Sequence, residues 1–372
     1  MFTIATALFE EARVEMINVL MVGNHPSNKG GMTSVINQIR SHDWTEDNVD
    51  LSFVPTFFPG NPLKKSLFFA YAYLRIFARM LIKRPDIVHM HMSYKGSFTR
   101  KYQIHKLCQA FGVKDIIHLH GSEFEKWYNE VDEKKKADIV RLLNEASAFI
   151  VLGEEWETVI KRITPDANVI VISNGVEIPT ETVSWNDKNC TVLFLGVLIP
   201  RKGVSDLIKA IKEIRDSKQL GLLKFVIAGT GEKEEELKRE AYDAGLADVV
   251  SFTGWVSGDK KKQLILDSQV LVSPSYNEGL PISILEAASY GMPIVSTDVG
   301  DISSVVKDGV NGALITPGDI DGLVNGILSV SSPEAFQRMS RNSRQIIEDS
   351  FSIESFYMKL KKLYQNLGEA DG

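Results

Sequence analysis

The sequence predicts an α/β protein built from two doubly wound domains that face a central cleft. At 372 residues the chain is too long for one ordinary hydrophobic core. Short apolar runs alternate with helical patterns, which is typical of parallel sheets covered by helices on both faces. A turn-rich stretch, residues 173–189, separates an earlier series of apolar runs from a later one. Each series therefore corresponds to one domain.

Eleven apolar runs carry this prediction. The first series of expected strands covers residues 17–23, 86–92, 115–121, 148–153 and 168–175. The second series covers residues 191–196, 224–229, 249–254, 269–275, 293–298 and 312–317. We assign residues 1–173 to an N-terminal domain and 174–351 to a C-terminal domain, and we expect an amphipathic helix at about 352–372 to pack back on the first. Ligands of doubly wound sheets lie beyond the carboxyl ends of the strands, so the site is expected in the cleft.

The composition excludes few classes of protein. A net charge of -6, with 44% hydrophobic and 24% charged residues, is ordinary for a soluble globular chain and argues against a dedicated nucleic-acid binder. Cys108 and Cys190 provide no disulfide framework, which favours a reducing, cytoplasmic compartment. Residues 1–16 lack a basic start and contain Glu10 and Glu11, so they make a poor signal peptide.

Positive charge is concentrated in one segment. Residues 60–114 contain eleven Lys or Arg and one acid, a charge of +10, so the rest of the chain carries -16. Such asymmetry predicts a surface that meets something anionic. Within this segment the apolar residues 66–84 are interrupted by Arg75 and Arg79, and each Arg at a bilayer centre costs roughly 2.5–3.5 kcal/mol. A membrane-spanning helix is therefore not expected, while a helix packed on a sheet and a helix touching the membrane surface both stay open.

The stretch "NEGLPISILEAASYGMP", residues 277–293, predicts an anion site. A strand precedes it, Pro281 begins a helix, and Gly291 lies near the helix end. The backbone N–H groups near this helix start attract phosphate. They belong to Gly279, Leu280 and Ile282.

Two carboxylates flank the predicted phosphate position. Glu278 precedes the helix, and Glu286 lies about one and a half turns into it and faces the same cleft. Because an ionised carboxylate only accepts hydrogen bonds, sugar hydroxyls are its natural partners. A nucleoside diphosphate that carries a sugar offers both the anion and the hydroxyls. The plainer alternative is that Glu278 caps the helix and Glu286 faces solvent.

Three further turns bear on phosphate binding. Gly30 and Gly31 lie between the first strand and a helix, where their backbone can cradle an anion. Arg201 and Lys202 follow a strand of the second domain, which favours ligand contact over a solvated basic turn. The "AGTGEKEEEL" turn at 228–237 lacks the third glycine of a dinucleotide fingerprint and is interpreted as a turn and helix start.

Several spaced motifs together resemble one family. They are "GVLIPRKGVSDLIKA" (196–210), "IAGTGEK" (227–233), "VVSFTGWV" (249–256) and the long run from "SPSYNEGLP" to "TPGD" (273–319). The chain resembles the retaining glycosyltransferases of family 4, also called group 1 glycosyl transferases, which have the two-domain GT-B fold. The resemblance is strong over most of residues 190–320 and patchy earlier, at 30–31, 89–91, 118–124 and 172–176.

The resemblance implies a role for each matching residue. Glu278 faces the donor sugar, Glu286 binds the ribose, and Lys202 with Arg201 neutralises the diphosphate. Val197 stands where the family usually has an Arg, so either Arg201 substitutes for it or the diphosphate is held more weakly. The remaining roles fall to Gly31 at the phosphate, His120 near the reacting sugar, and Trp255 with Val256 at the base.

The resemblance also implies a reaction. A sugar would move with retention from a UDP- or GDP-sugar to a glycan acceptor, with Glu278 as a positioning residue and no cofactor or metal. A lipid-linked acceptor of bacterial surface polysaccharide synthesis, used at the cytoplasmic face of an anionic inner membrane, is our hypothesis. The candidates for contact with the acceptor or membrane are Lys95, Arg100, Lys101, Arg75 and Arg79. Alternatives are a GT-B-like sugar-nucleotide epimerase or phosphorylase, and a non-catalytic sugar-nucleotide-binding protein.

Two patterns invite a metal interpretation, which we consider the lesser one. His89 and His91, and again His118 and His120, each lie on one face of an expected strand, but a zinc site needs further ligands. Asp319 belongs to an Asp-x-Asp pattern, yet it follows "TPG" and precedes a helical run, so it is predicted to be a helix N-cap.

Overall fold

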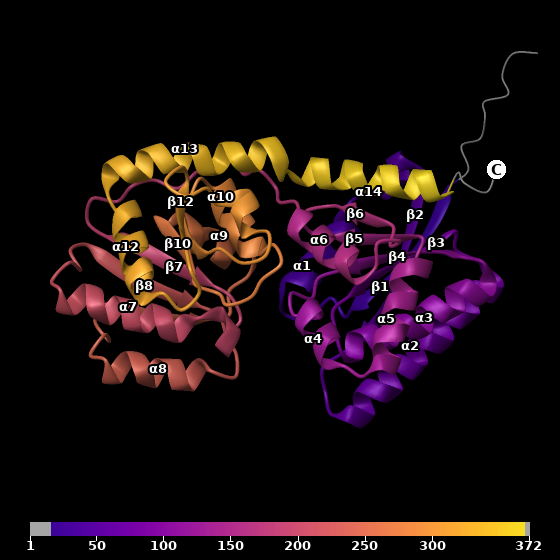
Figure 1. Ribbon diagram of the computed structural model, residues 1–372. Coiled ribbons are helices and arrows are strands. Elements are labelled where there is room, and N and C mark those ends of the chain that lie inside the picture. Colours follow the sequence, from indigo (N-terminus) through magenta and orange to yellow (C-terminus); the bar gives the residue numbers. More distant parts are fainter. Residues whose placement is uncertain (1–15, 369–372) are drawn as a thin grey trace, which may run out of the picture.

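The computed structural model describes residues 16–368, so the predicted absence of a signal peptide falls mostly outside the described residues. Two parallel six-stranded sheets lie side by side, each covered by helices, and this is the GT-B arrangement that the sequence predicts (Figure 1). The strands are β1 (Ile17–Asn24), β2 (Val49–Phe57), β3 (Ile87–Met92), β4 (Lys114–Leu119), β5 (Ala148–Val151), β6 (Val169–Val171), β7 (Cys190–Leu195), β8 (Leu223–Ala228), β9 (Val250–Gly254), β10 (Val270–Ser273), β11 (Ile294–Thr297) and β12 (Gly312–Ile315).

Helices connect the strands in both domains. The N-terminal domain holds α1 (Gly31–Ser41), η1 (Trp44–Asp47), α2 (Pro62–Ile82), α3 (Gly96–Phe111), α4 (Phe124–Glu130), α5 (Glu133–Glu145) and α6 (Glu154–Ile163). The later helices are η2 (Pro200–Lys202), α7 (Val204–Asp216), α8 (Glu234–Asp243), α9 (Gly258–Leu266), α10 (Ile282–Ser289), α11 (Ile302–Val305), α12 (Ile320–Val330), α13 (Pro333–Ser350) and α14 (Ile353–Gly368). The Asp319 side chain accepts a hydrogen bond from the Gly322 N–H at 2.8 Å, which confirms the predicted N-cap of α12.

Strand β2 is the one strand that the sequence analysis missed. It lies at the edge of the first sheet, most of its residues are only half-buried, and it contains Pro55. An edge strand needs hydrogen bonds on one side only, so it tolerates a proline and polar residues that would be excluded from a central strand. Its pattern therefore lacks the continuous apolar run by which the other strands were predicted.

The strand order places the loops that form the site. The first sheet has the order β2-β1-β3-β4-β5-β6, and the second has the order β12-β11-β10-β7-β8-β9. The direction of winding thus reverses between β1 and β3, and again between β7 and β10. Ligand sites of doubly wound sheets form at such reversals, beyond the carboxyl ends of the strands. The glycine loop follows β1, the Arg201–Lys202 turn follows β7, and the Glu278 loop follows β10.

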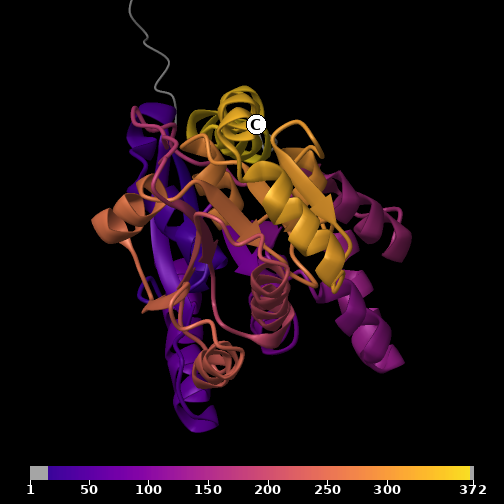
Figure 2. The ribbon, with the colours of Figure 1, turned by 90° about the vertical axis from the view of Figure 1, so that its left-hand side faces the viewer.

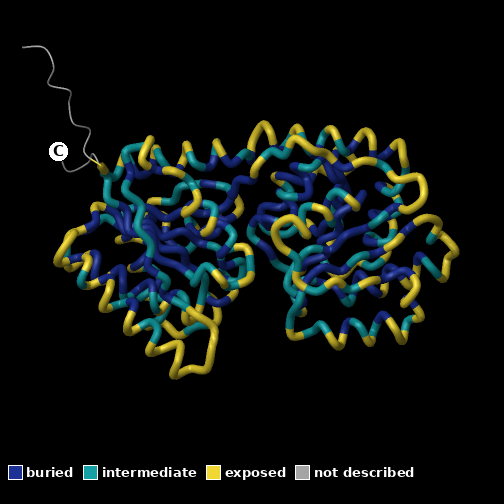
Figure 3. The backbone as a smooth tube through the Cα atoms, turned by 180° about the vertical axis from the view of Figure 1, so that it is seen from behind, coloured by how far each residue is buried: buried dark blue, intermediate teal, exposed yellow. Residues whose placement is uncertain are grey.

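The last two helices join the domains. Helix α13 runs over the C-terminal domain, and α14 continues along the N-terminal domain (Figure 1). On α14, the Tyr357 hydroxyl donates to the Gln38 carbonyl at 3.0 Å, and Lys361 pairs with Asp47 at 2.7 Å. Buried residues form the interiors of both domains, while exposed residues follow the outer helices (Figure 3). Helix α14 therefore packs against the N-terminal domain, whose last strand ends about 180 residues earlier in the sequence.

Candidate functional site

A backbone contact and a glycine hold the two site loops of the C-terminal domain together. The Tyr276 N–H donates to the Arg201 carbonyl at 2.8 Å, which fastens the turn after β7 to the loop after β10. Gly203 ends the η2 turn with φ 68°, and a Cβ there would lie 1.9 Å from the Pro274 carbonyl oxygen. A side chain at position 203 would separate the loops, so glycine permits Lys202 to approach the Glu278 loop.

Glu278 is buried among cations. The Lys202 ammonium donates to Glu278 Oε1, and Arg201 Nη1 lies 3.4 Å from Glu278 Oε2 and donates to the Asn277 carbonyl at 2.7 Å. Burial alone would raise the pKa of Glu278, but the charges of Lys202 and Arg201 outweigh it and lower the pKa below its usual value. Glu278 is therefore ionised at neutral pH and can accept hydrogen bonds but cannot donate a proton.

The alternative in which Glu278 caps the helix and Glu286 faces solvent is wrong. Pro281 is the N-cap residue of α10, and no side chain caps that helix, so Glu278 is not its cap. Glu286 is only 24% exposed at its side chain and forms an ion pair with Lys261. Both carboxylates therefore face the cleft between the domains.

A cavity of about 480 Å³ lies between the two domains. Both domains line it, and Figure 2 shows them viewed end-on, the C-terminal domain in front. Every residue assigned to catalysis or donor binding from the sequence lines this cavity: Gly30, Gly31, His120, Arg201, Lys202, Trp255, Val256, Glu278, Gly279, Leu280, Ile282 and Glu286. Gly30 has φ 126°, and a Cβ on Gly30 or Gly31 would meet nothing within 4 Å, so the backbone of this loop is open to a ligand.

Among the cavity residues that were not predicted from the sequence, three make notable polar contacts. Lys29 reaches across the cleft, with Nζ 3.4 Å from Thr230 Oγ1 and 5.2 Å from the Trp255 ring centroid. Lys261 neutralises Glu286, and the amide nitrogen of Asn174 donates to the Leu280 carbonyl at 3.0 Å. Lys29 adjoins the glycine pair, but Lys261 lies in a run of three lysines that looks like an ordinary solvated helix face.

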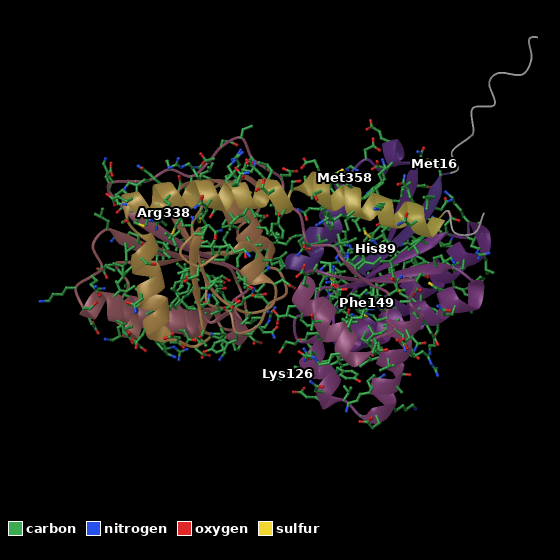
Figure 4. The ribbon with its side chains drawn as sticks, turned by 45° about the horizontal axis from the view of Figure 1, so that its top comes forward. Met16, His89, Lys126, Phe149, Arg338 and Met358 are labelled. Carbon is green, nitrogen blue, oxygen red and sulfur yellow. The ribbon has the colours of Figure 1, made fainter. Side chains whose placement is uncertain are left out.

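The four predicted histidines form a cluster inside the N-terminal domain, where Figure 4 labels His89. Three of them, His89, His91 and His118, are fully buried, and His120 is half-buried at the cavity. His89 bonds the Tyr364 hydroxyl of α14 at 2.7 Å and His118 at 3.2 Å, and His91 bonds His120 at 2.8 Å. Burial lowers the pKa of His89 and of His120 to about 3, and lowers those of His91 and His118 well below the usual value. The imidazoles are therefore neutral at pH 7.

The ring nitrogens of His89, His91 and His118 lie within 4.8 Å of one another, so these three could hold a metal ion. Most of these nitrogens already form hydrogen bonds, and among the fully buried ring nitrogens of the described cluster only His118 Nε2 has no partner. The contacts form two separate hydrogen-bonded sets, Tyr364–His89–His118 and His91–His120, and the imidazole rings of the two sets stack on one another.

One of the five candidates for acceptor or membrane contact was wrong. Lys101 is fully buried and donates to the Thr56 hydroxyl at 2.7 Å, and burial lowers its pKa well below the usual value. Arg100 is half-buried over the Phe57 ring at 4.8 Å, whereas Lys95, Arg75 and Arg79 are exposed. Lys101 lies on the side of α3 that faces Thr56 of β2. The composition of the segment could not predict which side of the helix this lysine occupies.

The comparisons define the class of protein. Residues 33–178 match the family model described as Glycosyltransferase Family 4, and residues 179–346 match the model described as Glycosyl transferases group 1. The chain therefore belongs to glycosyltransferase family 4 and is a glycosyltransferase. This result favours the predicted activity over the alternatives of a sugar-nucleotide epimerase and a non-catalytic protein.

Individual relatives are distant. The chain is 28% identical over 348 residues to the Escherichia coli UDP-Gal:alpha-D-GlcNAc-diphosphoundecaprenol alpha-1,3-galactosyltransferase, covering 87% of this chain and 85% of that one. It is 24% identical to the amylovoran biosynthesis glycosyltransferase AmsK of Erwinia amylovora, covering 77% and 72%. Among solved structures, the sucrose-phosphate synthase of Thermosynechococcus elongatus superposes with a TM-score of 0.80 at 17% identity, covering 94% and 99%. Anabaena HepE in complex with UDP gives 0.74 at 18% identity, covering 94% and 100%.

Proposed function

We propose that this protein transfers a sugar, with retention, from a UDP-sugar to the terminal sugar of a lipid-linked acceptor in bacterial surface polysaccharide synthesis. The cluster of Glu278, Lys202 and Arg201 at the start of α10 carries the proposal. The printed names of the E. coli and Erwinia relatives support the acceptor and the pathway, and the UDP bound to HepE supports the donor. Action on such an acceptor implies work at the cytoplasmic face of the inner membrane.

The proposed donor site uses groups that already face the cavity. Lys202 and Arg201 would meet the diphosphate together with the N–H groups at the start of α10, and so stabilise the charge that develops on the leaving group. Arg201 lies in the same cluster as Lys202, which supports its substitution for the Arg missing at Val197. Glu286 would exchange Lys261 for the ribose hydroxyls, and Trp255 with Val256 would line the base.

The mechanism follows from the state of Glu278. Positive charge develops at the anomeric carbon as its bond to the phosphate oxygen breaks, and an ionised Glu278 can orient the sugar by accepting its hydroxyl hydrogens. A carboxylate held by Lys202 is a weak nucleophile, so we assign attack to the acceptor hydroxyl from the side of the departing phosphate. That phosphate then takes the acceptor proton.

A second cavity on the other side of Glu278 suits the acceptor sugar. Its volume is about 430 Å³, and residues of α4 and α6 line it together with Asn277, Glu278 and Gly300. Acids predominate among the charged side chains of its wall: Glu125, Glu130, Glu155 and Glu278, against Lys126. Burial, followed by the nearby charges of Asp298 and Glu125, raises the pKa of Glu155. Such a wall binds hydroxyls and repels anions, so the receiving sugar would be uncharged while its diphosphate stays outside.

A donor and acceptor screen tests the proposal. With a short-chain polyprenyl diphosphate that carries one neutral sugar, we expect release of UDP from one UDP-sugar to rise at least tenfold over the rate without acceptor. Proton NMR of the product should give the same anomeric configuration as the donor. Release of GDP only, an inverted product, or interconversion of donors without acceptor would each contradict the proposal.

Lys202→Met should raise the Kd of UDP by about 10–100-fold, since a charge-assisted hydrogen bond to the diphosphate is lost. Isothermal titration calorimetry measures this Kd, and thermal unfolding checks that the variant folds. Lys212→Met is a matched control, because Lys212 is half-exposed on α7 and pairs with Asp216 outside the cavity. Equal UDP affinity in the Lys202 variant and the control would refute diphosphate binding by Lys202.

A further inference from the structure

Helix α2 exposes an apolar stripe to solvent. Of the 15 large apolar side chains that are exposed in residues 16–368, seven belong to this one helix. They are Leu63, Leu67, Tyr71, Leu74, Phe77, Leu81 and Ile82, with exposed fractions of 39–85%. Scattered exposed apolar residues are normal, but a contiguous row on one element indicates a surface that meets a partner.

The stripe occupies the face of α2 that points away from the protein. Leu63, Leu67, Tyr71, Leu74 and Leu81 follow one another at intervals of three, four and seven residues, which places them along one side of a helix. The inward face, which packs toward β2, is buried through Ala72, Ile76 and Met80. The helix is thus apolar on two sides, and its inward face alone accounts for its packing.

The charge around the stripe selects the partner. Lys64, Lys65, Arg75 and Arg79 lie on α2 itself, and residues 51–85 contain no Asp or Glu. The Arg75 guanidinium lies 5.8 Å from the ring centroid of Tyr71, so the cations border the apolar row directly. Apolar residues bordered by cations, with no acid between them, match the acyl region and the phosphates of an anionic bilayer.

We propose that α2 is a membrane-docking helix that lies in the plane of an anionic lipid bilayer, with its leucine stripe in the acyl region and its basic residues at the phosphates. None of the described helices is long and apolar enough to span a membrane, in agreement with the sequence prediction for this segment. A 21-residue helix is about 30 Å long, and docking along this length would fix the orientation of the whole domain.

The same geometry brings the bilayer near the cleft. Helix α2 begins just after β2, and the Phe58 ring between them lies 5.2 Å from the ring of His25, centroid to centroid. His25 directly follows β1, whose last residue, Asn24, lines the large cavity. An acceptor anchored in the docked bilayer could therefore reach the cleft past the first turn of α2. The delivery of an acceptor to the cleft rests on the proposed function, whereas the docking of α2 on the bilayer does not.

Vesicle co-sedimentation of the full chain tests the docking helix. We expect binding to phosphatidylcholine vesicles that contain about one-third phosphatidylglycerol, and at least tenfold weaker binding to pure phosphatidylcholine. Leu67→Glu/Leu74→Glu should reduce binding to the anionic vesicles at least tenfold, because the stripe would gain two negative charges. Tyr242→Glu/Met358→Glu is the matched control, since it places the same two charges on exposed apolar positions of α8 and α14 and should bind as the wild type does.

The activity assay separates this inference from the proposed function. With a water-soluble acceptor that lacks the lipid tail, Leu67→Glu/Leu74→Glu should keep a wild-type rate, while its rate on vesicle-borne acceptor falls. The proposal of a docking helix would be overturned if the wild-type protein did not bind anionic vesicles, or if the stripe variant bound them as tightly as the control. A wild-type dimer that the stripe variant converts to monomers would also overturn it, because the partner of α2 would then be a second copy of the chain.

Discussion

Glu278→Gln is expected to lower kcat by about 10²–10³-fold, the usual effect of losing one preorganised charge at a reacting centre. Glutamine keeps the size of the side chain and one oxygen acceptor but loses the negative charge beside the developing positive charge of the sugar. The loss should appear in kcat, because the carboxylate matters most when the sugar becomes cationic. Steady-state release of UDP with acceptor present measures it.

The same substitution should leave UDP binding unchanged or make it tighter. In this structure Glu278 shares its charge with Lys202 and Arg201, and glutamine would leave both cations free for the diphosphate. Glu286→Gln provides the contrast, since the loss of a ribose partner should raise the Kd of UDP with a smaller effect on kcat. A Glu278→Gln enzyme with near-normal kcat, or one whose only defect is a raised Kd for UDP, would contradict the positioning role.

Acid should destabilise the fold through the histidine cluster. The pKa values of His89 and His120 are about 3 in the folded protein, and those of His91 and His118 are also lowered, whereas an unfolded histidine has a pKa near 6.5. As the pH falls through 6.5 toward 3, only the unfolded state takes up protons, so folding stability decreases. From about pH 7.5 to 5.5, His89 and His120 each lower the free energy of unfolding by about 1.4 kcal/mol, and the lowered pKa values of His91 and His118 act in the same direction.

One histidine acts in the opposite direction. Burial alone would lower the pKa of His105, but its hydrogen bond to Asp115 and the charges of Asp115 and Glu145 raise it. A raised pKa adds stability as the pH falls, so His105 offsets part of the loss. Asp301 acts in the same direction as His105, because burial raises its pKa to about 6, so the expected net decrease is smaller than the loss from the cluster alone.

Urea unfolding at a series of pH values measures the effect. His118→Asn removes one proton acceptor of the unfolded state and should therefore reduce the total loss. Tyr364→Phe is the control, because it removes the hydrogen bond to His89 but no imidazole, so it should lower stability at pH 7.5 and keep the same pH dependence. A stability that does not change between these pH values would show that the cluster accepts protons in the folded state.

Local signals in the sequence identified much of the fold and the donor side of the cleft. The cap at Asp319 was predictable because an N-cap depends on residues within one turn of the helix. The buried central strands were predictable because each is a continuous apolar run. Glu278 and Glu286 were singled out because a glycine, a proline and a helix start lie between or beside them within ten residues.

Pairings between distant segments were not predictable in this way. Lys202 and Glu278 are 76 residues apart and meet because a reversal of strand order brings the loops after β7 and β10 together. In the sequence, Lys261 resembles a solvated lysine, but α9 places it beside Glu286. Lys101 resembles a surface cation, but α3 places it beside Thr56.

The sequence by itself thus determined the two domains, most strands and the residue types of the donor clamp, because these depend on local periodicity and turn chemistry. The tertiary structure alone decided which cation neutralises which carboxylate, which lysine is buried, and that the leucines of α2 form its outward row. Those outcomes depend on the side of each element that meets the sheet, and packing of the whole chain sets that side.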